Sequence, residues 1–387
     1  MSAPERRDRN AGAPSAVFAL VTGGGTGGHV QPALAIAEAL VAAGHDHSSI
    51  QFVGGRRGME GRLVPESGFR ITCLPGRGLE RRLSARNLRS SLELLCAVAM
   101  ALRIVRRTRP RVAVTVGGYA GFPAGIAALA LRVPLVVVTY DAVPGAVNRL
   151  LSRAAAVNAV AYPGTRLPRS VVTGPPVRAA VLAADRGPTG RRAARRLLGI
   201  DEERRLVVVT GGSLGASSIN QATVDLGRAW HHRSDVCLYH VAGDRDREAV
   251  AAEAREAGVG DGLLEYRLVG FERRMPVVLA ACDVLVGRAG ASTVAELCAV
   301  GVPSVLVPLP NAPFDHQARN AEALASTGAA VVLRDEELTG DALARILDGL
   351  LDKPRQLASM EDSARALGRR DAASRVAALV ESVARPS

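Results

Sequence analysis

The sequence predicts an α/β protein made of two similar halves, each a parallel sheet flanked by helices, that face one another across a cleft. Apolar runs of strand length alternate with segments of helical periodicity along most of the chain, as in parallel α/β proteins. One local pattern, an apolar run followed by a glycine-rich turn and a helix, stands at residues 17–43 and again at 206–230. The chain has 387 residues, more than one typical hydrophobic core accommodates. We therefore expect two Rossmann-like domains.

The first half opens with a strand, a glycine turn and a helix within residues 17–43. The apolar run from Val17 predicts the strand, and residues such as Leu34 and Leu40 at helical spacing predict the helix. The glycines let the backbone approach a ligand closely, and the helix start presents unpaired N–H groups. The turn therefore favours an anion, most often a phosphate. His29, directly after the glycines, either meets that ligand or is an exposed histidine at a helix start.

This first turn also satisfies the dinucleotide-binding fingerprint G-x-G-x-x-G through Gly23, Gly25 and Gly28. The fingerprint requires an acidic residue about 20 residues later, at the end of the next strand. Here that strand runs into two glycines, Arg56 and Arg57. The pattern disfavours NAD and leaves NADP with only weak support.

Two more glycine turns follow apolar strands, GGYAGFPAG at 117–125 and GGSLGA at 211–216. Ligands of parallel sheets bind outside the carboxyl ends of the strands, so the three turns are expected to converge on the cleft. The periodicity predicts further strands at 50–53, near 71, and at 112–116, 135–138, 157–160, 171–172, 206–210, 237–241, 263–269, 284–286 and 304–307, and helices at 59–66, 88–106, 217–230, 247–256, 275–281, 292–300, 315–327 and 338–350.

Composition excludes several classes of protein. The formal net charge of +12 indicates an acidic partner, either nucleic acid, a phosphorylated small molecule or anionic lipid. Aromatic residues make up only 3% and do not alternate with basic ones, so binding to single-stranded nucleic acid is poorly supported. The five cysteines show no C-x-x-C spacing, which argues against zinc and a disulfide framework. No apolar run is long enough to span a membrane, and the N-terminus lacks a secretory pattern, so we expect a cytoplasmic protein.

Shifts in composition predict the domain boundaries. The first segment is polar and basic, and the stretch after TGPPVR is rich in Ala, Arg and Gly without a strand pattern. We expect a disordered tail at 1–15, an N-terminal domain at 16–178, a linker at 179–199, a C-terminal domain at 200–365, and a final helix at 366–387 that packs back on the N-terminal domain.

The segment 77–95 combines leucines with arginines in a basic loop that leads into a helix. One interpretation places it on a membrane surface, with its apolar side down and its arginines at anionic headgroups. The other is an ordinary domain helix with a solvated basic face.

The stretch RAGASTVAE at 288–296 is a second candidate for nucleotide binding. Small residues open another helix, Ser292 and Thr293 can cap it or touch phosphate, and Glu296 lies one turn further on. The Glu296 carboxylate is suited to accept hydrogen bonds from a ribose diol; its alternative role is to compensate the helix dipole.

Seven motifs in this order resemble the bacterial MurG family of N-acetylglucosaminyltransferases, over nearly the whole chain from residue 17. They are GGGTGGHVQPALAIAEAL, GRRGMEGRLVPESGF, GGYAGFPAG, TGPPVR, GGSLGASSINQ, FERRMPVVLAACDVLVGRAGASTVAEL and PLPNAPFDHQARNAEAL. The resemblance implies a GT-B fold, which is two Rossmann-like domains facing across a cleft. It also implies transfer of GlcNAc from UDP-GlcNAc to the MurNAc 4-hydroxyl of lipid I, giving lipid II with inversion in peptidoglycan synthesis.

The resemblance further implies partners, location and site residues. No metal ion or other cofactor is expected; the partners are UDP-GlcNAc, polyprenyl-linked lipid I and the anionic cytoplasmic face of the cell membrane, where the protein would be peripheral. His29 would act as general base or orient the reacting hydroxyl, with Asp141 as the second catalytic candidate and a substrate contact. The residues implied to bind substrate are Thr26, Gly27, Gly28 and Asp141 on the acceptor and sugar side, Arg178 and Ser213 at the diphosphate, Ala291, Ser292, Thr293 and Glu296 at the nucleotide, Phe271 near the uracil and Gln317 at the GlcNAc hydroxyls.

Three motifs depart from the family pattern. The usual His-Glu-Gln-Asn is Val138 to Asp141 here, TGNPVR has become TGPPVR, and GGSQGA has become GGSLGA with Leu214. Asp141 keeps an acceptor and loses an amide donor. These departures leave alternatives open: a GT-B transferase acting on another glycolipid or secondary-metabolite acceptor, an inactive paralogue that binds and recruits, or a UDP-GlcNAc epimerase.

Overall fold

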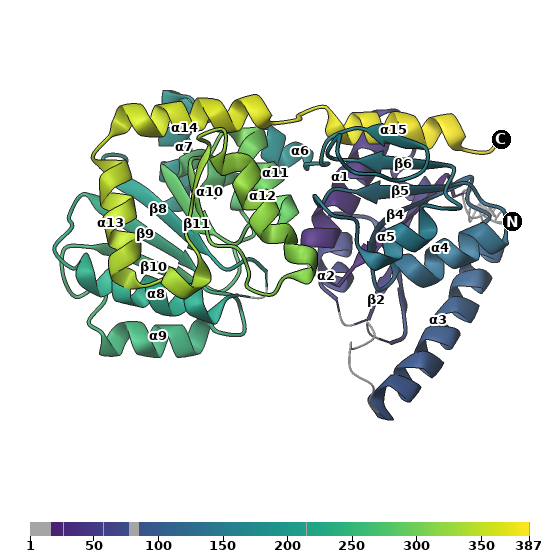
Figure 1. Cartoon of the computed structure of the whole chain (residues 1–387), viewed down its shortest axis with the longest axis horizontal. Coiled ribbons are helices and arrows are strands. Elements are labelled where there is room, and N and C mark those ends of the chain that lie inside the picture. The colour runs from purple at the N-terminus through teal and green to yellow at the C-terminus, as the bar shows by residue number, and fades with distance from the viewer. Residues whose placement is uncertain (1–16, 26, 57, 77–84, 214, 387) are drawn as a thin grey trace, which may run out of the picture.

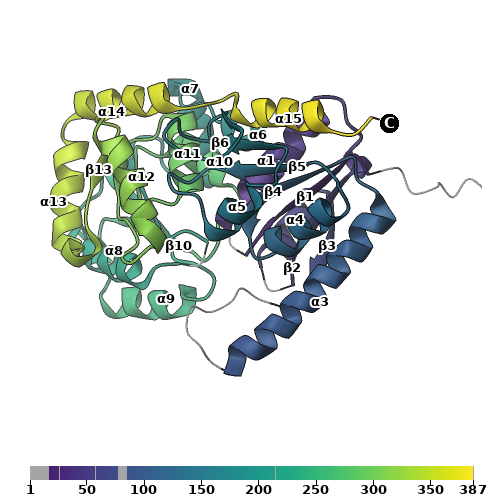
Figure 2. The same ribbon diagram turned by 45° about the vertical axis from the view of Figure 1, so that its right-hand side comes forward.

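The computed structural model describes residues 17–25, 27–56, 58–76, 85–213 and 215–386. It has two lobes, each built on one parallel sheet, and the last helices run from the C-terminal lobe back to the N-terminal lobe (Figures 1 and 2). The two-sheet α/β architecture predicted from the sequence is therefore confirmed.

The N-terminal lobe contains a seven-stranded sheet in the order β3-β2-β1-β4-β5-β6-β7. Strand order reverses between β1 and β4, the position where doubly wound sheets bind ligands. Its elements are β1 (Ala19–Gly24), α1 (Gly27–Ala42), β2 (Ile50–Gly55), α2 (Glu60–Glu66), β3 (Arg70–Leu74), α3 (Ala85–Thr108), β4 (Val112–Gly118), α4 (Gly121–Ala130), β5 (Leu135–Thr139), α5 (Ala146–Leu151), β6 (Val157–Val160) and β7 (Ser170–Val172).

The C-terminal lobe contains a six-stranded sheet in the order β10-β9-β8-β11-β12-β13. Its elements, from the end of the N-terminal sheet onwards, are α6 (Ala179–Leu182), α7 (Pro188–Leu198), β8 (Arg205–Thr210), α8 (Ser217–Ala229), β9 (Val236–Val241), α9 (Arg247–Glu256), β10 (Glu265–Val269), α10 (Met275–Ala281), β11 (Val284–Gly287), α11 (Ala291–Val300), β12 (Ser304–Leu306), α12 (His316–Ala325), β13 (Ala330–Val332), α13 (Gly340–Leu351), α14 (Pro354–Leu367) and α15 (Ala372–Val383), with short 3₁₀ turns at His47–Ser49, Pro313–Asp315 and Asp335–Glu337.

Both sheets are covered by helices on their two faces. In the N-terminal lobe, residues of α1 and α15 share one core with β1, and residues of α3 and α4 form the other core on the opposite face. In the C-terminal lobe, α7, α10 and α11 contribute to one core and α8 and α13 to the other. Strands buried on both faces explain the unbroken apolar runs of the sequence.

Helix α15 lies against the N-terminal lobe although it is last in the chain (Figure 1). Val376 and Val380 are fully buried in the core beneath α1, and Glu381 pairs with His45 at 2.9 Å. The chain thus crosses between the lobes twice, once before α6 and once after α14.

The expected helices and strands agree with the structure to within a few residues, with some additions. The segment 179–199 is helical over α6 and α7, and β13 was not expected from the sequence. Within the described ranges, no helix has the length and apolarity that crossing a membrane demands.

Candidate functional site

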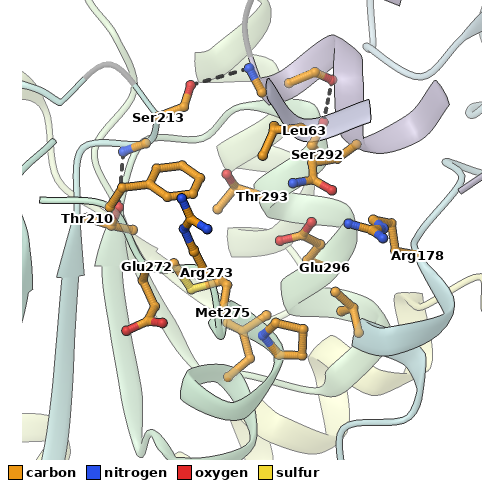
Figure 3. Close-up of a pocket in the computed structure, with 18 of the residues that line it drawn as sticks. Leu63, Arg178, Thr210, Ser213, Glu272, Arg273, Met275, Ser292, Thr293 and Glu296 are labelled. Carbon is orange, nitrogen blue, oxygen red and sulfur yellow. Dashed lines mark hydrogen bonds between the residues drawn. The ribbon is translucent and has the colours of Figure 1, made fainter. Parts of the chain in front are cut away.

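A cavity of about 440 Å³ lies between the two lobes, and both lobes supply its walls (Figure 3). The N-terminal lobe contributes the start of α1 and one side of α2, and the C-terminal lobe contributes the turn after β8, the segment before α10 and the start of α11. The predicted site residues that line this cavity are Gly27, Gly28, Arg178, Ser213, Phe271, Ser292, Thr293 and Glu296.

The first and third glycine turns meet at this cavity, as the sequence predicts. The backbone N–H of Gly27 donates to Ser213 Oγ at 3.4 Å, and Ser292 Oγ donates to the carbonyl of Gly28 at 2.7 Å. Figure 3 draws both bonds as dashed lines between the lobes. Ser213 comes from the third turn and Ser292 from the start of α11, so both join the C-terminal lobe to the start of α1.

The second turn does not line this cavity. None of the residues described as lining the cavity comes from 117–125. Gly118 has a φ of +77° and packs so closely on the backbone of Gly24 that a Cβ there would overlap the Gly24 carbonyl. The second turn therefore packs against the backbone of the first turn.

Glu296 is the most perturbed acid in the cavity. Burial raises the pKa of its carboxyl from 4.5 to about 7, and the positive charge of Arg178 opposes that rise. In Figure 3 the two side chains point toward one another across the cavity. A carboxyl whose pKa lies near neutrality, in a cleft, is typical of a functional site.

Arg178 is already engaged by a carboxylate of the N-terminal lobe. Its Nε and Nη2 donate to Glu38 Oε1 at 2.9 and 2.5 Å, and Glu38 Oε2 accepts from the backbone N–H of Ala179 at 3.2 Å. Nη2 also donates to Ser67 Oγ at 3.4 Å. A guanidinium has five N–H donors, so the two on Nη1 remain for a diphosphate. The sequence did not reveal Glu38, which lies 140 residues before Arg178.

Phe271 lines the cavity and also contacts the N-terminal lobe. The Cζ atom of Arg62, on α2, lies 4.6 Å from the centre of its ring. Arg62 also pairs with Asp244 at 3.4 Å, and Arg273 pairs with Glu66 at 3.3 Å. These contacts join α2 to the C-terminal lobe at the edge of the cavity, and sequence patterns gave no sign of them.

His29 and Asp141 lie close together in the N-terminal lobe, and neither is among the residues that line the cavity. The ring of His29 stands edge-on to Tyr140, with centroids 6.0 Å apart. Burial lowers the pKa of His29 and raises the pKa of Asp141, and the charge of each opposes the shift in the other. At neutral pH the imidazole is therefore neutral and able to accept a proton.

A second histidine, His316, faces this pair from the C-terminal lobe and was not predicted from the sequence. Its charge lowers the pKa of both His29 and Asp141. His316 is the first residue of α12, directly before Gln317, so the motif DHQARNA was the signal that could have revealed it. The loop before it contacts the N-terminal lobe, where Arg149 Cζ lies 4.6 Å from the ring centre of Phe314.

Two further predicted residues, Gln317 and Ala291, do not line the cavity. Gln317 Oε1 accepts from the backbone N–H of Leu309 at 3.0 Å, and the residue is not among those that line the cavity. Ala291 is buried in the core that α1 and α15 share, so its small side chain packs the lobes together and does not face the cavity. Thr26 and Leu214 lie outside the described residues.

Two doubly wound sheets facing across a cavity, with helix starts from both lobes at its rim, form the GT-B fold. Comparison with known proteins agrees. The N-terminal domain of glycosyltransferase family 28 matches residues 19–160, and its C-terminal domain matches residues 206–376.

Comparison with individual named proteins identifies the family more closely. Enzymes named UDP-N-acetylglucosamine--N-acetylmuramyl-(pentapeptide) pyrophosphoryl-undecaprenol N-acetylglucosamine transferase match at 41% identity in Acidothermus cellulolyticus, over 94% of this chain and 97% of the relative, and at 36% in Desulfitobacterium hafniense, over 92% and 96%. The crystal structure of Acinetobacter baumannii MurG matches with a TM-score of 0.70 at 28% identity, over 95% of this chain and 99% of that one. This chain therefore belongs to the MurG family within glycosyltransferase family 28.

Proposed function

We propose that this protein transfers GlcNAc from UDP-GlcNAc to the MurNAc 4-hydroxyl of lipid I and forms lipid II with inversion. The observation that carries the proposal is the cavity between the lobes, which combines the amide-bearing third turn and Glu296 on one wall with the start of α1 on the other. Such a cavity suits a nucleotide diphospho-sugar whose two ends are held by different domains. The names of the relatives supply the donor and the acceptor.

On the donor side, the residues of the C-terminal lobe take the nucleotide. Phe271 packs near the uracil, Glu296 accepts from the ribose hydroxyls, and Ser213 donates its hydroxyl to the diphosphate. The N–H groups of Arg178 that do not bind Glu38 or Ser67 donate to the diphosphate and offset its negative charge as UDP leaves. This arrangement provides the charge stabilisation that a leaving diphosphate requires.

On the acceptor side, His29 is the general base. The 4-hydroxyl oxygen attacks the anomeric carbon, its proton passes to the neutral His29 imidazole, and the bond from the anomeric carbon to the phosphate oxygen breaks, so that UDP leaves with the electron pair. Asp141 then stabilises the imidazolium. Because burial lowers the pKa of His29, the base stays unprotonated at neutral pH.

The acceptor has a polyprenyl chain, so the protein acts at the anionic cytoplasmic face of the membrane. Helix α3 supports this location. Leu92 and Leu95 on its surface are 59% and 66% exposed. In both views the first turns of α3 project beyond the rest of the N-terminal lobe (Figures 1 and 2). The arginines of the preceding basic loop, at 77–84, lie outside the described residues.

The test incubates purified protein with UDP-GlcNAc and a short-chain lipid I analogue and measures UDP release together with the disaccharide product. Wild type should turn over, and the double variant His29→Ala, Glu296→Ala should not. Absence of the disaccharide from wild type would refute the proposal. The same assay with other glycolipid acceptors, or with none, separates a transferase of different specificity and an epimerase from the proposed activity.

A further inference from the structure

Glu60, the first residue of α2, is a buried carboxylate that the proposed chemistry does not use. It is 1% exposed and lies between the ends of β1 and β2. Its Oε1 accepts from the backbone N–H of Gly55 at 2.6 Å, and its Oε2 accepts from the backbone N–H of Gly25 at 2.9 Å. One donor thus comes from the first glycine turn and the other from the end of the neighbouring strand.

Three other glycines make the space for this side chain. A Cβ added at Gly24, Gly54 or Gly58 would overlap the Glu60 side chain. Glycines 24, 54 and 58 therefore admit the carboxylate, while Gly25 and Gly55 bind it. Gly25 has a φ of +108°, a conformation that favours glycine. The glycine pattern that resembles a phosphate loop in the sequence surrounds an acid of the same chain.

In a doubly wound sheet, a phosphate binds at the end of β1, on the N–H groups at the start of the following helix. The Glu60 carboxylate lies beside that place and is held by the backbone N–H groups of Gly25 and Gly55. We propose that Glu60 is an internal anion that occupies these two amides and excludes phosphate groups from this part of the first turn. A phosphate beside the buried Glu60 carboxylate would meet like-charge repulsion and two amides that already have an acceptor.

Glu60 is also a positioning residue for the cavity wall. It begins α2, and Leu63, Glu66 and Ser67 on and after that helix line the cavity. The two hydrogen bonds of its carboxylate therefore tie the first turn to the wall opposite the third turn. This part of the inference rests on the proposed function, whereas the anion exclusion does not.

The experiment replaces the internal anion by an added one. Glu60→Ala vacates a volume with two amide donors, so sodium formate should raise its melting temperature more than sodium chloride of equal ionic strength does. Inorganic phosphate should bind this variant about tenfold or more tightly than it binds wild type, the change that one charge-assisted hydrogen bond supports. If the variant folds poorly, formate present during refolding should recover folded protein. None of these readouts requires turnover, so they remain valid whether or not the proposed function holds.

Two variants serve as controls. Val64→Ala, on the same helix and 1% exposed, loses core packing without losing an anion, so formate should not stabilise it beyond the salt effect. Glu60→Gln fills the space with a neutral group and should show neither response. Equal responses of Glu60→Ala and Val64→Ala to formate, a response of Glu60→Gln as large as that of Glu60→Ala, or phosphate binding to wild type as tight as to Glu60→Ala would each overturn the proposal.

Discussion

Glu296→Gln should stabilise the ligand-free protein and weaken nucleotide binding at the same time. Burial raises the pKa of Glu296 from 4.5 to about 7. The unfolded chain therefore ionises this carboxyl at a lower pH than the folded protein does. The contribution of the group to stability is complete below pH 4.5 and is lost as the pH rises through 7.

The size of this effect follows from the shift. A change from 4.5 to about 7 is about 2.5 units, and at about 1.36 kcal/mol per unit it corresponds to about 3 kcal/mol. This is an upper limit because the carboxyl borders the cavity and water reaches one side of it. Glutamine has no charge to bury, so Glu296→Gln should be more stable than wild type by up to about 3 kcal/mol above pH 7 and equally stable at about pH 4.

The assay is urea unfolding of both proteins across this pH range, with UDP titrations alongside. The variant should bind UDP about 10- to 150-fold more weakly, because a charged acceptor for the ribose hydroxyls is lost. Glu253→Gln, which removes an exposed carboxylate from α9, is the matched control and should change neither quantity. A pH-independent stability difference, or unchanged UDP affinity in Glu296→Gln, would refute the reasoning.

Four further outcomes are expected. His29→Ala should lower kcat about 10²- to 10⁴-fold and leave UDP affinity unchanged in calorimetry; a changed UDP affinity would contradict its role as base. His316→Ala should raise the pKa of His29, since the charge of His316 lowers it, and should thus move the acidic limb of the rate profile to higher pH; an unmoved limb would contradict the coupling. Arg62→Ala should raise the KM for the donor about 2- to 5-fold through the lost contact with Phe271, with kcat unchanged; a fall in kcat alone would count against it. Replacing Leu92 and Leu95 together by Ser should weaken binding to anionic vesicles about tenfold or more, measured by co-sedimentation; equal binding would exclude this face of α3.

The fold was predictable because most of its signals are local. Each central strand, such as β4 or β8, is an apolar run closed by glycines, and the period changes at the next helix. The missed strand β13 has only three residues, Ala330–Val332, between a helix and a turn. A run of that length gives no period to detect, and its place at the sheet edge comes from pairing with β12.

The site was predictable only in part, because its partners are far apart in sequence. The third turn and Glu296 were recognised from local motifs, and both line the cavity. Glu38 and Arg178 are separated by 140 residues, and Gly25 and Glu60 by 35. No rule of sequence spacing connects such pairs. The contact of Glu60 with the first turn and that of Glu38 with Arg178 can therefore be seen only in the folded structure.

The hydrogen bonds of Ser213 and Ser292 distinguish two serines that the sequence predicts equally to contact phosphate. Ser213 accepts a hydrogen bond from Gly27, so its own O–H remains able to donate to a phosphate while the lobes are in contact. Ser292 donates its only O–H to the Gly28 carbonyl and can offer a further partner only acceptor lone pairs. Ser213 can therefore donate to a diphosphate while it keeps its bond from Gly27, whereas Ser292 can donate to one only after its O–H turns away from the Gly28 carbonyl.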